Sequence, residues 1–137
     1  VRGWLDRVED PWLWGLFRHE VAGTWVSPAG VAILGDAAHP TLPFLAQGAS
    51  MGLEDAWVLA DCLGRAAAIP SGLAAYQARR KPRATRIVAA ANANARAYHL
   101  AGLPRLIGHA GLRLLSRLSP GTMISRFDWL YGHDVTR

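Results

Sequence analysis

A short run of apolar residues, Val31–Leu34, places the strongest constraint on the fold, because Gly35 and Asp36 end it abruptly. An apolar run of this length without alternation predicts a strand that is buried on both faces. Pro40 and Pro43 follow, and prolines at these positions exclude a regular helix through the next stretch. The predicted unit is therefore strand, loop and helix, with Asp36 at the carboxyl end of the strand, where ligands of open α/β sheets bind.

The rest of the chain divides into a segment with strands and a segment with helices. We expect two further strands before the central one, over 13–21 and 25–26. After it we expect only helices, with Ser71 as an N-cap and with Pro82 kinking or breaking the chain. These helical stretches run over 49–64, 72–81, 83–100 and 106–118. A lone buried strand needs neighbours on both sides, and few are present here, so the sequence resembles the back half of a larger fold.

Composition excludes several classes of protein. Of the 137 residues, 51% are hydrophobic and 18% are charged, which predicts a packed globular chain and excludes intrinsic disorder. Cys62 is the one cysteine, so an internal disulfide is impossible and a reducing compartment is indicated. No apolar run approaches the roughly 18 residues that cross a bilayer, and no signal-peptide pattern opens the sequence. We therefore expect a cytoplasmic protein without a transmembrane segment.

Charge is divided unevenly along the chain, although the net value is +5. Residues 1–61 hold three basic and eight acidic residues, whereas residues 62–127 hold eleven basic residues and no acid. Such a basic block can bind nucleic acid or an acidic surface. It can also form helix faces whose acidic partners lie on another segment, which is the interpretation we favour. Only Tyr98 and Phe127 accompany the arginines, and this argues against stacking on single-stranded nucleic acid.

The segment from Gly30 to Leu63 carries the residues with chemical potential. A carboxylate at the end of a strand, such as Asp36, can accept hydrogen bonds from the hydroxyls of a ribityl or ribose chain. Gly48 lets the backbone approach a ligand closely before the helix begins. The free N–H groups of Ala49, Ser50 and Met51 would then face an anionic or electron-rich group. Together these features predict a unit that cradles a cofactor.

These residues resemble a known family. The stretches Gly35–Pro40, Gln47–Gly48 and Glu54–Ala56, together with Pro43, resemble the second flavin motif of the FAD-dependent aromatic hydroxylases, which include the salicylate and hydroxynicotinate hydroxylases. The series Tyr76, Arg80, Pro82 and Arg83 is similar to a helix of that family, and the ending Asp128–Asp134 looks like the tail of its salicylate hydroxylase branch. The resemblance covers about residues 25–137.

The resemblance implies a fold, a division of the chain and a reaction. The fold would be the C-terminal portion of an α/β FAD-binding and NAD(P)-binding architecture with a mostly helical C-terminal half. Residues 1–29 would end the substrate-covering sheet, 30–64 would form the FAD-binding segment, and 65–137 would form the helical region. Such enzymes hydroxylate a small aromatic substrate with NADH or NADPH and O2, through a hydroperoxyflavin, and no metal is expected.

The resemblance also implies roles for particular residues. Asp36 would bind the ribityl chain of FAD, Pro43 would flank the place where oxygen reacts, and the backbone at Ala49 and Ser50 would face the pyrimidine edge of the ring. No catalytic residue is assigned in this chain. The expected cofactor-binding residues are Gly35, Asp36, Pro43, Gln47, Gly48, Ala49, Ser50 and Met51.

The sequence departs from the family pattern in two ways. Leu45 and Ala46 stand where the family often has glycine, which makes the loop stiffer. The fingerprint Gly-x-Gly-x-x-Gly occurs nowhere, so we expect this chain to hold half of an FAD site. One alternative is therefore a truncated, inactive flavin-binding fragment. A second alternative is an α/β-hydrolase with Ser50 as nucleophile, because Gly48–Gly52 fits Gly-x-Ser-x-Gly.

Several other residues receive structural interpretations. We expect His39 to be a structural hydrogen-bonding residue, and Cys62 and Trp57 to lie in the core. Glu54 and Asp55 are adjacent, so they should point to different sides of a helix and form no acid–base pair. One of the two acids should pair with the basic block downstream.

Overall fold

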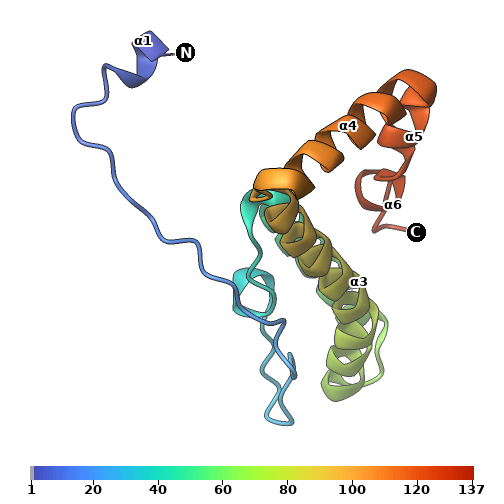
Figure 1. The fold of residues 1–137 in the computed structure, drawn as a ribbon. Coiled ribbons are helices and arrows are strands. Elements are labelled where there is room, and N and C mark those ends of the chain that lie inside the picture. Colours follow the sequence, from blue (N-terminus) through green and yellow to red (C-terminus); the bar gives the residue numbers. More distant parts are fainter. Residues whose placement is uncertain (1) are drawn as a thin grey trace.

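Two long helices, α2 (Gly48–Arg65) and α3 (Ile69–Tyr98), pack against one another in the computed structural model, which describes residues 2–137. Helix α4 (Gly102–Leu118) leaves the end of α3 at an angle, and the chain then turns back beneath it (Figure 1). The shorter elements are α1 (Arg2–Leu5), the 3-10 turns η1 (Gly35–Ala37) and η2 (Pro43–Leu45), α5 (Pro120–Ser125) and α6 (Asp128–Tyr131).

The core lies between α2 and α3. The residues that α2 buries are Met51, Asp55, Val58 and Cys62, whose spacing of four, three and four places them on one helix face. Helix α3 packs against it with a buried face of similar spacing. Cys62 is only 6% exposed, so the prediction that it is a core residue is confirmed. Trp57, in contrast, is 54% exposed, and its predicted place in the core is wrong.

The predicted strand over 31–34 is not formed in the described part of the chain, where only one isolated antiparallel bridge, between Val26 and Ala32, occurs. The predicted strands over 13–21 and 25–26 are likewise not formed as strands. The expected α/β sheet is therefore not confirmed. A buried strand needs a neighbour on each side, and residues 2–137 offer only the segment at Trp25. As a result Val31 is 59% exposed.

A small hairpin nevertheless leads into the turn that carries Asp36. The N–H of Ile33 donates to the carbonyl of Trp25 at 2.9 Å, and the N–H of Ser27 donates to the carbonyl of Val31 at 2.8 Å. Tyr76 on α3 donates its hydroxyl to the carbonyl of Ile33 at 3.0 Å. The hairpin is thus held against α3, and the chain arrives at η1 in a fixed position.

The helices begin and end largely where the sequence indicates, with α3 and the start of α4 as exceptions. Helix α3 is continuous from Ile69 to Tyr98 with Pro82 inside it, so of the two predicted outcomes, a kink or a break, the break does not occur. Ion pairs with α2 on both sides of Pro82, from Arg80 to Asp55 and from Arg83 to Glu54, help to offset the lost hydrogen bond. The N-cap is Ala68 rather than Ser71. Helix α4 starts four residues before the predicted start at 106, because Pro104 is tolerated in a first turn.

The N-terminal arm, residues 2–20, runs away from the helices as an extended segment that ends in α1 (Figure 1). Its large side chains are exposed, with Trp4 at 77%, Trp12 at 86% and Trp14 at 80%. Trp25, just after the arm, is 1% exposed and belongs to the core. Of the four tryptophans before residue 30, Trp25 is therefore the one that is buried. No described helix is both long enough and apolar enough to cross a membrane.

Candidate functional site

A cavity of about 550 Å³ opens where η1, η2 and the start of α2 meet. Its volume lies within the range typical of small-molecule sites. The structure brings five of the eight predicted site residues to its wall. The residues that line it are Gly35, Asp36, Thr41, Pro43, Ala46, Gly48, Ala49 and Gly52.

Asp36 reaches the cavity because of the tight turn in η1. Gly35 has φ +59°, a left-handed conformation that glycine adopts without strain. The carbonyl of Gly35 then accepts hydrogen bonds from the N–H groups of Ala38 and His39, each at 2.9 Å. The Asp36 side chain is exposed. Its carboxylate is therefore free to accept hydrogen bonds from a ligand.

The start of α2 supplies backbone donors to the same cavity. The N–H of Met51 donates to the carbonyl of Gln47 at 2.9 Å, so the prediction that it is free is wrong. The preceding N–H groups, those of Gly48, Ala49 and Ser50, come before the first helical hydrogen bond and have no acceptor within the helix. No side chain caps this end of α2. A helix start with free donors attracts negative charge.

Glycines keep the cavity open. A Cβ atom added at Gly52 would lie 3.9 Å from the Cα of Gly35, and one added at Gly48 would lie 3.6 Å from Cγ2 of Thr41. These are ordinary contacts, so a methyl group fits, but a larger side chain would extend into the cavity. The donors, the carboxylate and the open space together fit a ligand that has hydroxyl groups and an electron-rich edge, as FAD has.

The other predicted site residues occupy different environments. Gln47 is 8% exposed and Met51 is fully buried, so both support the start of α2 from within. Ser50 is exposed but does not line the cavity. Ala46, which the family resemblance singled out, has φ +51° and ψ +37° and ends η2 in a left-handed conformation. This conformation costs energy in any residue with a Cβ atom.

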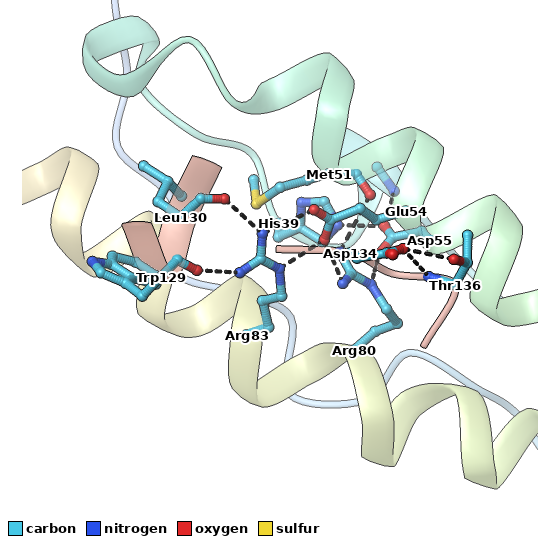
Figure 2. A network of polar contacts seen from close by, with 11 residues as sticks. His39, Met51, Glu54, Asp55, Arg80, Arg83, Trp129, Leu130, Asp134 and Thr136 are labelled. Carbon is cyan, nitrogen blue, oxygen red and sulfur yellow. Dashed lines mark hydrogen bonds and ion pairs between the residues drawn. The ribbon is translucent and has the colours of Figure 1, made fainter. Parts of the chain in front are cut away.

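A buried polar network lies beside the cavity, and Figure 2 shows how its side chains converge. Asp55 is fully buried and accepts three hydrogen bonds: from the N–H of Gly35 at 2.9 Å, from Nε2 of His39 at 2.5 Å, and from Nε of Arg80 at 2.7 Å. His39 is fully buried as well. The prediction that it is a structural hydrogen-bonding residue is confirmed.

Glu54 extends the network toward the C-terminus. Nη1 of Arg80 lies 2.6 Å from the Glu54 carboxylate, and Nε and Nη2 of Arg83 donate to it at 2.8 and 2.9 Å. Arg83 also donates to the carbonyls of Trp129 and Leu130, which attaches α6 to α3 (Figure 2). The network therefore links the cavity wall to the end of the chain.

Both acids in the network have pKa values below their usual range. Burial opposes ionisation of Asp55, but hydrogen bonds from His39, Gly35 and Arg80 outweigh it and lower its pKa. Burial likewise opposes ionisation of Glu54, and Arg83 and Arg80 lower its pKa. Each acid is thus held as a carboxylate by donors that stabilise the charged form.

The placement of these acids corrects one prediction and extends another. We expected one acid to pair with the basic block, and both do. We also expected them to point to different sides of the helix, yet both reach Arg80, because the guanidinium is forked and lies between them. The sequence signal that could have revealed this is the spacing of Tyr76, Arg80 and Arg83, which places three polar groups on one face of α3.

Acids from the first half of the chain pair with four of the eleven basic residues of the block, Arg65 among them. Arg79 pairs with Asp61 at 2.7 Å, in addition to the pairs that Arg80 and Arg83 make. Over 79–83 the arginines therefore form a helix face that is paired with acids from another segment. The Gly48–Gly52 stretch follows η2 rather than a strand in the described chain, so the nucleophile-elbow arrangement at Ser50 is not formed.

Comparison with known proteins identifies a family and several relatives. The profile of the FAD binding domain family matches residues 16–91, which include every residue that lines it. A 3-amino-4-hydroxybenzoate 2-monooxygenase of Streptomyces platensis is 37% identical over 89% of this chain, and a 3-hydroxybenzoate 6-hydroxylase of Polaromonas naphthalenivorans is 36% identical over 89%. A salicylate hydroxylase of Pseudomonas putida is 37% identical over 98%. The chain spans 30% of the length of each of these relatives.

Proposed function

Because this chain belongs to the FAD binding domain family, we propose that it forms one side of the FAD site of an aromatic-ring monooxygenase. The enzyme would use NADH or NADPH and O2 to hydroxylate a small aromatic acid. The named activities of the relatives, on 3-amino-4-hydroxybenzoate, 3-hydroxybenzoate and salicylate, support this substrate class. Bound FAD would supply the oxygen chemistry, and the protein would supply binding and orientation.

The observation that carries the proposal is the convergence of a carboxylate and a helix start on one cavity. Asp36 would accept hydrogen bonds from the ribityl hydroxyls, and its place on η1 would set the position of that chain. The N–H groups of Gly48, Ala49 and Ser50 would face the pyrimidine edge of the ring. Pro43, at the start of η2, would bound the cavity on the side where oxygen reacts.

The backbone donors would also tune the cofactor. Reduction of a flavin places negative charge on its ring, and fixed N–H dipoles stabilise charge without the cost of reorienting. The helix start is preorganised in this sense, because α2 is anchored through Asp55 and Glu54 to α3. The expected contribution is a higher affinity for the reduced than for the oxidised cofactor.

The sheet, the division of the chain into segments and the cellular location are part of the same proposal. We propose that the hairpin at Trp25 and the run over 31–34 join a sheet of α/β type that other parts of a flavoprotein fold complete. The segments 1–29, 30–64 and 65–137 would then serve as the end of the substrate sheet, the flavin segment and the helical region. We also propose a cytoplasmic location, because the single cysteine indicates a reducing compartment and the reaction needs NAD(P)H.

The test uses the protein expressed from its complete gene and supplied with FAD. NADH and NADPH oxidation is measured with and without salicylate, 3-hydroxybenzoate and 3-amino-4-hydroxybenzoate, and hydroxylated products are identified by mass spectrometry. We expect one of these acids, or a close analogue, to accelerate oxidation and to yield a product that carries one new ring hydroxyl group. Flavin binding without any hydroxylated product would support the inactive fragment instead, and absence of flavin binding would overturn the proposal.

A further inference from the structure

We propose that Asp55 is the positioning residue of the flavin site, because it anchors both ends of the turn that presents Asp36 to the cavity. This inference rests on the proposed function, and it assigns a role to a residue that does not itself line the cavity. Asp55 would act through Asp36 and would contact no part of the cofactor.

The anchoring is visible in the contacts of a single oxygen atom. Oδ2 of Asp55 accepts the N–H of Gly35 at 2.9 Å and also the side chain of His39 at 2.5 Å. The carbonyl of Gly35 accepts the N–H of His39, which closes the turn on itself. Asp36 therefore lies between two residues that are tied to the same atom, and its backbone has little freedom to move.

The anchor itself is rigid. Asp55 is fully buried and Arg80 is 2% exposed, and Nε of Arg80 binds Oδ1 of Asp55 at 2.7 Å. Arg80 also lies 3.4 Å from the carbonyl of Met51 in the first turn of α2, the helix that supplies the backbone donors. One carboxylate thus ties together the two parts of the site, the turn at η1 and the start of α2.

The ring of His39 has no other polar contact within the described residues. Its Nδ1 atom is buried and has no hydrogen-bond partner within residues 2–137, so Asp55 is the only polar group that orients the ring. Trp25 lies against the ring, with centroids 5.3 Å apart, and contributes packing only. Loss of the Asp55 carboxylate would therefore free both ends of the turn together.

Glu54 provides a matched control. It is adjacent to Asp55, carries the same charge and shares Arg80, but within the described residues it makes no hydrogen bond with Gly35 or His39. Asp55→Asn retains one acceptor oxygen and replaces the other with a donor, so the side chain can serve either Arg80 or the turn and not both. Glu54→Gln changes charge and an Arg80 contact to the same extent and leaves the turn anchored.

The first measurement is hydrogen exchange on the protein from its complete gene, without FAD. Asp55→Asn should accelerate exchange in the peptide spanning 35–39 by about tenfold, whereas Glu54→Gln should leave it within about twofold. Equal acceleration by both variants would contradict the anchoring role. Where Asp55→Asn does not fold, His39→Leu replaces it, and His39→Gln, which keeps a donor toward Asp55, should restore slow exchange.

The second measurement is a double-mutant cycle on FAD affinity. Asp55→Asn should weaken FAD binding by about tenfold when Asp36 is present and by less than about twofold in an Asp36→Asn background. The reason is that Asp55 acts by positioning Asp36, whose carboxylate makes the contact with FAD. Equal losses in both backgrounds would overturn the inference and leave the proposed function intact. Failure of Asp36→Asn to weaken binding, or of the unaltered protein to bind FAD, would overturn both.

Discussion

Arg83 donates two parallel hydrogen bonds to the carboxylate of Glu54, from Nε at 2.8 Å and from Nη2 at 2.9 Å. This is the planar, forked geometry that an arginine can form and a lysine cannot. The same guanidinium donates to the carbonyls of Trp129 and Leu130. A side chain of α3 therefore holds α2 and α6 at once, and the C-terminal end of the chain depends on it.

Replacing this arginine tests the attachment of α6. Arg83→Lys should lower the free energy of unfolding by about 1–3 kcal/mol, because one ammonium group cannot satisfy the carboxylate and both carbonyls. Urea unfolding measures the change, and hydrogen exchange should increase most at 128–131. Arg96→Lys, on an exposed position of α3, is the control and should change stability by less than about 0.5 kcal/mol. Equal effects of the two variants would contradict the account.

The lowered pKa of Glu54 predicts a defined pH dependence. Its pKa in the folded protein lies below the ordinary value of 4.5, so its contribution to stability is complete above about pH 5 and is lost as the pH falls through the folded pKa. Glu54→Gln lacks this contribution at every pH. The difference in free energy of unfolding between the two proteins should therefore be largest near neutral pH and shrink in acid. Urea titrations at pH 7, 5, 4 and 3 measure it.

A control on the arm separates this effect from a general charge effect. Glu9→Gln removes an exposed carboxylate of the N-terminal arm and should leave stability unchanged across the same pH range. A difference between wild type and Glu54→Gln that grows toward low pH would show that the sign is wrong.

Much of the site could be predicted from the sequence because its residues are close along the chain. Asp36, Pro43 and Gly48 occur within thirteen residues, and local turn and helix-start chemistry is enough to bring them to one cavity. The buried helix faces also follow from spacing alone. Motif and periodicity describe short-range geometry well.

The errors arise where distant segments decide the outcome. The run over 31–34 has the composition of a strand, but strand formation depends on neighbours, and the described chain pairs it only with the short segment 25–27. Pro82 carries a local signal to end a helix, which packing of α3 on α2 overrides. Asp55 meets Gly35 across twenty residues and Arg80 across twenty-five, and no local pattern encodes either contact.

The backbone conformation of Ala46 predicts that its replacement by glycine stabilises the protein. Its left-handed conformation, with φ +51°, favours glycine, so Ala46→Gly should raise the free energy of unfolding by about 0.5–1 kcal/mol. The same change at Ala74, an exposed position inside α3, should lower it by about 1 kcal/mol. Thermal and urea unfolding of the two variants measure the opposite signs. Destabilisation by Ala46→Gly would show that the loop does not hold this conformation.

The central claim is that the cavity at the start of α2 binds FAD, and filling that cavity tests it most directly. Gly52→Leu would place a side chain beside Gly35, whereas Gly64→Leu, near the end of the same helix, adds a Cβ with nothing within 4 Å. Titration of the protein from its complete gene, followed by quenching of flavin fluorescence, measures both. The account predicts that Gly52→Leu weakens FAD binding by at least about tenfold while Gly64→Leu binds as the unaltered protein does. Equal FAD affinity for all three proteins would contradict it.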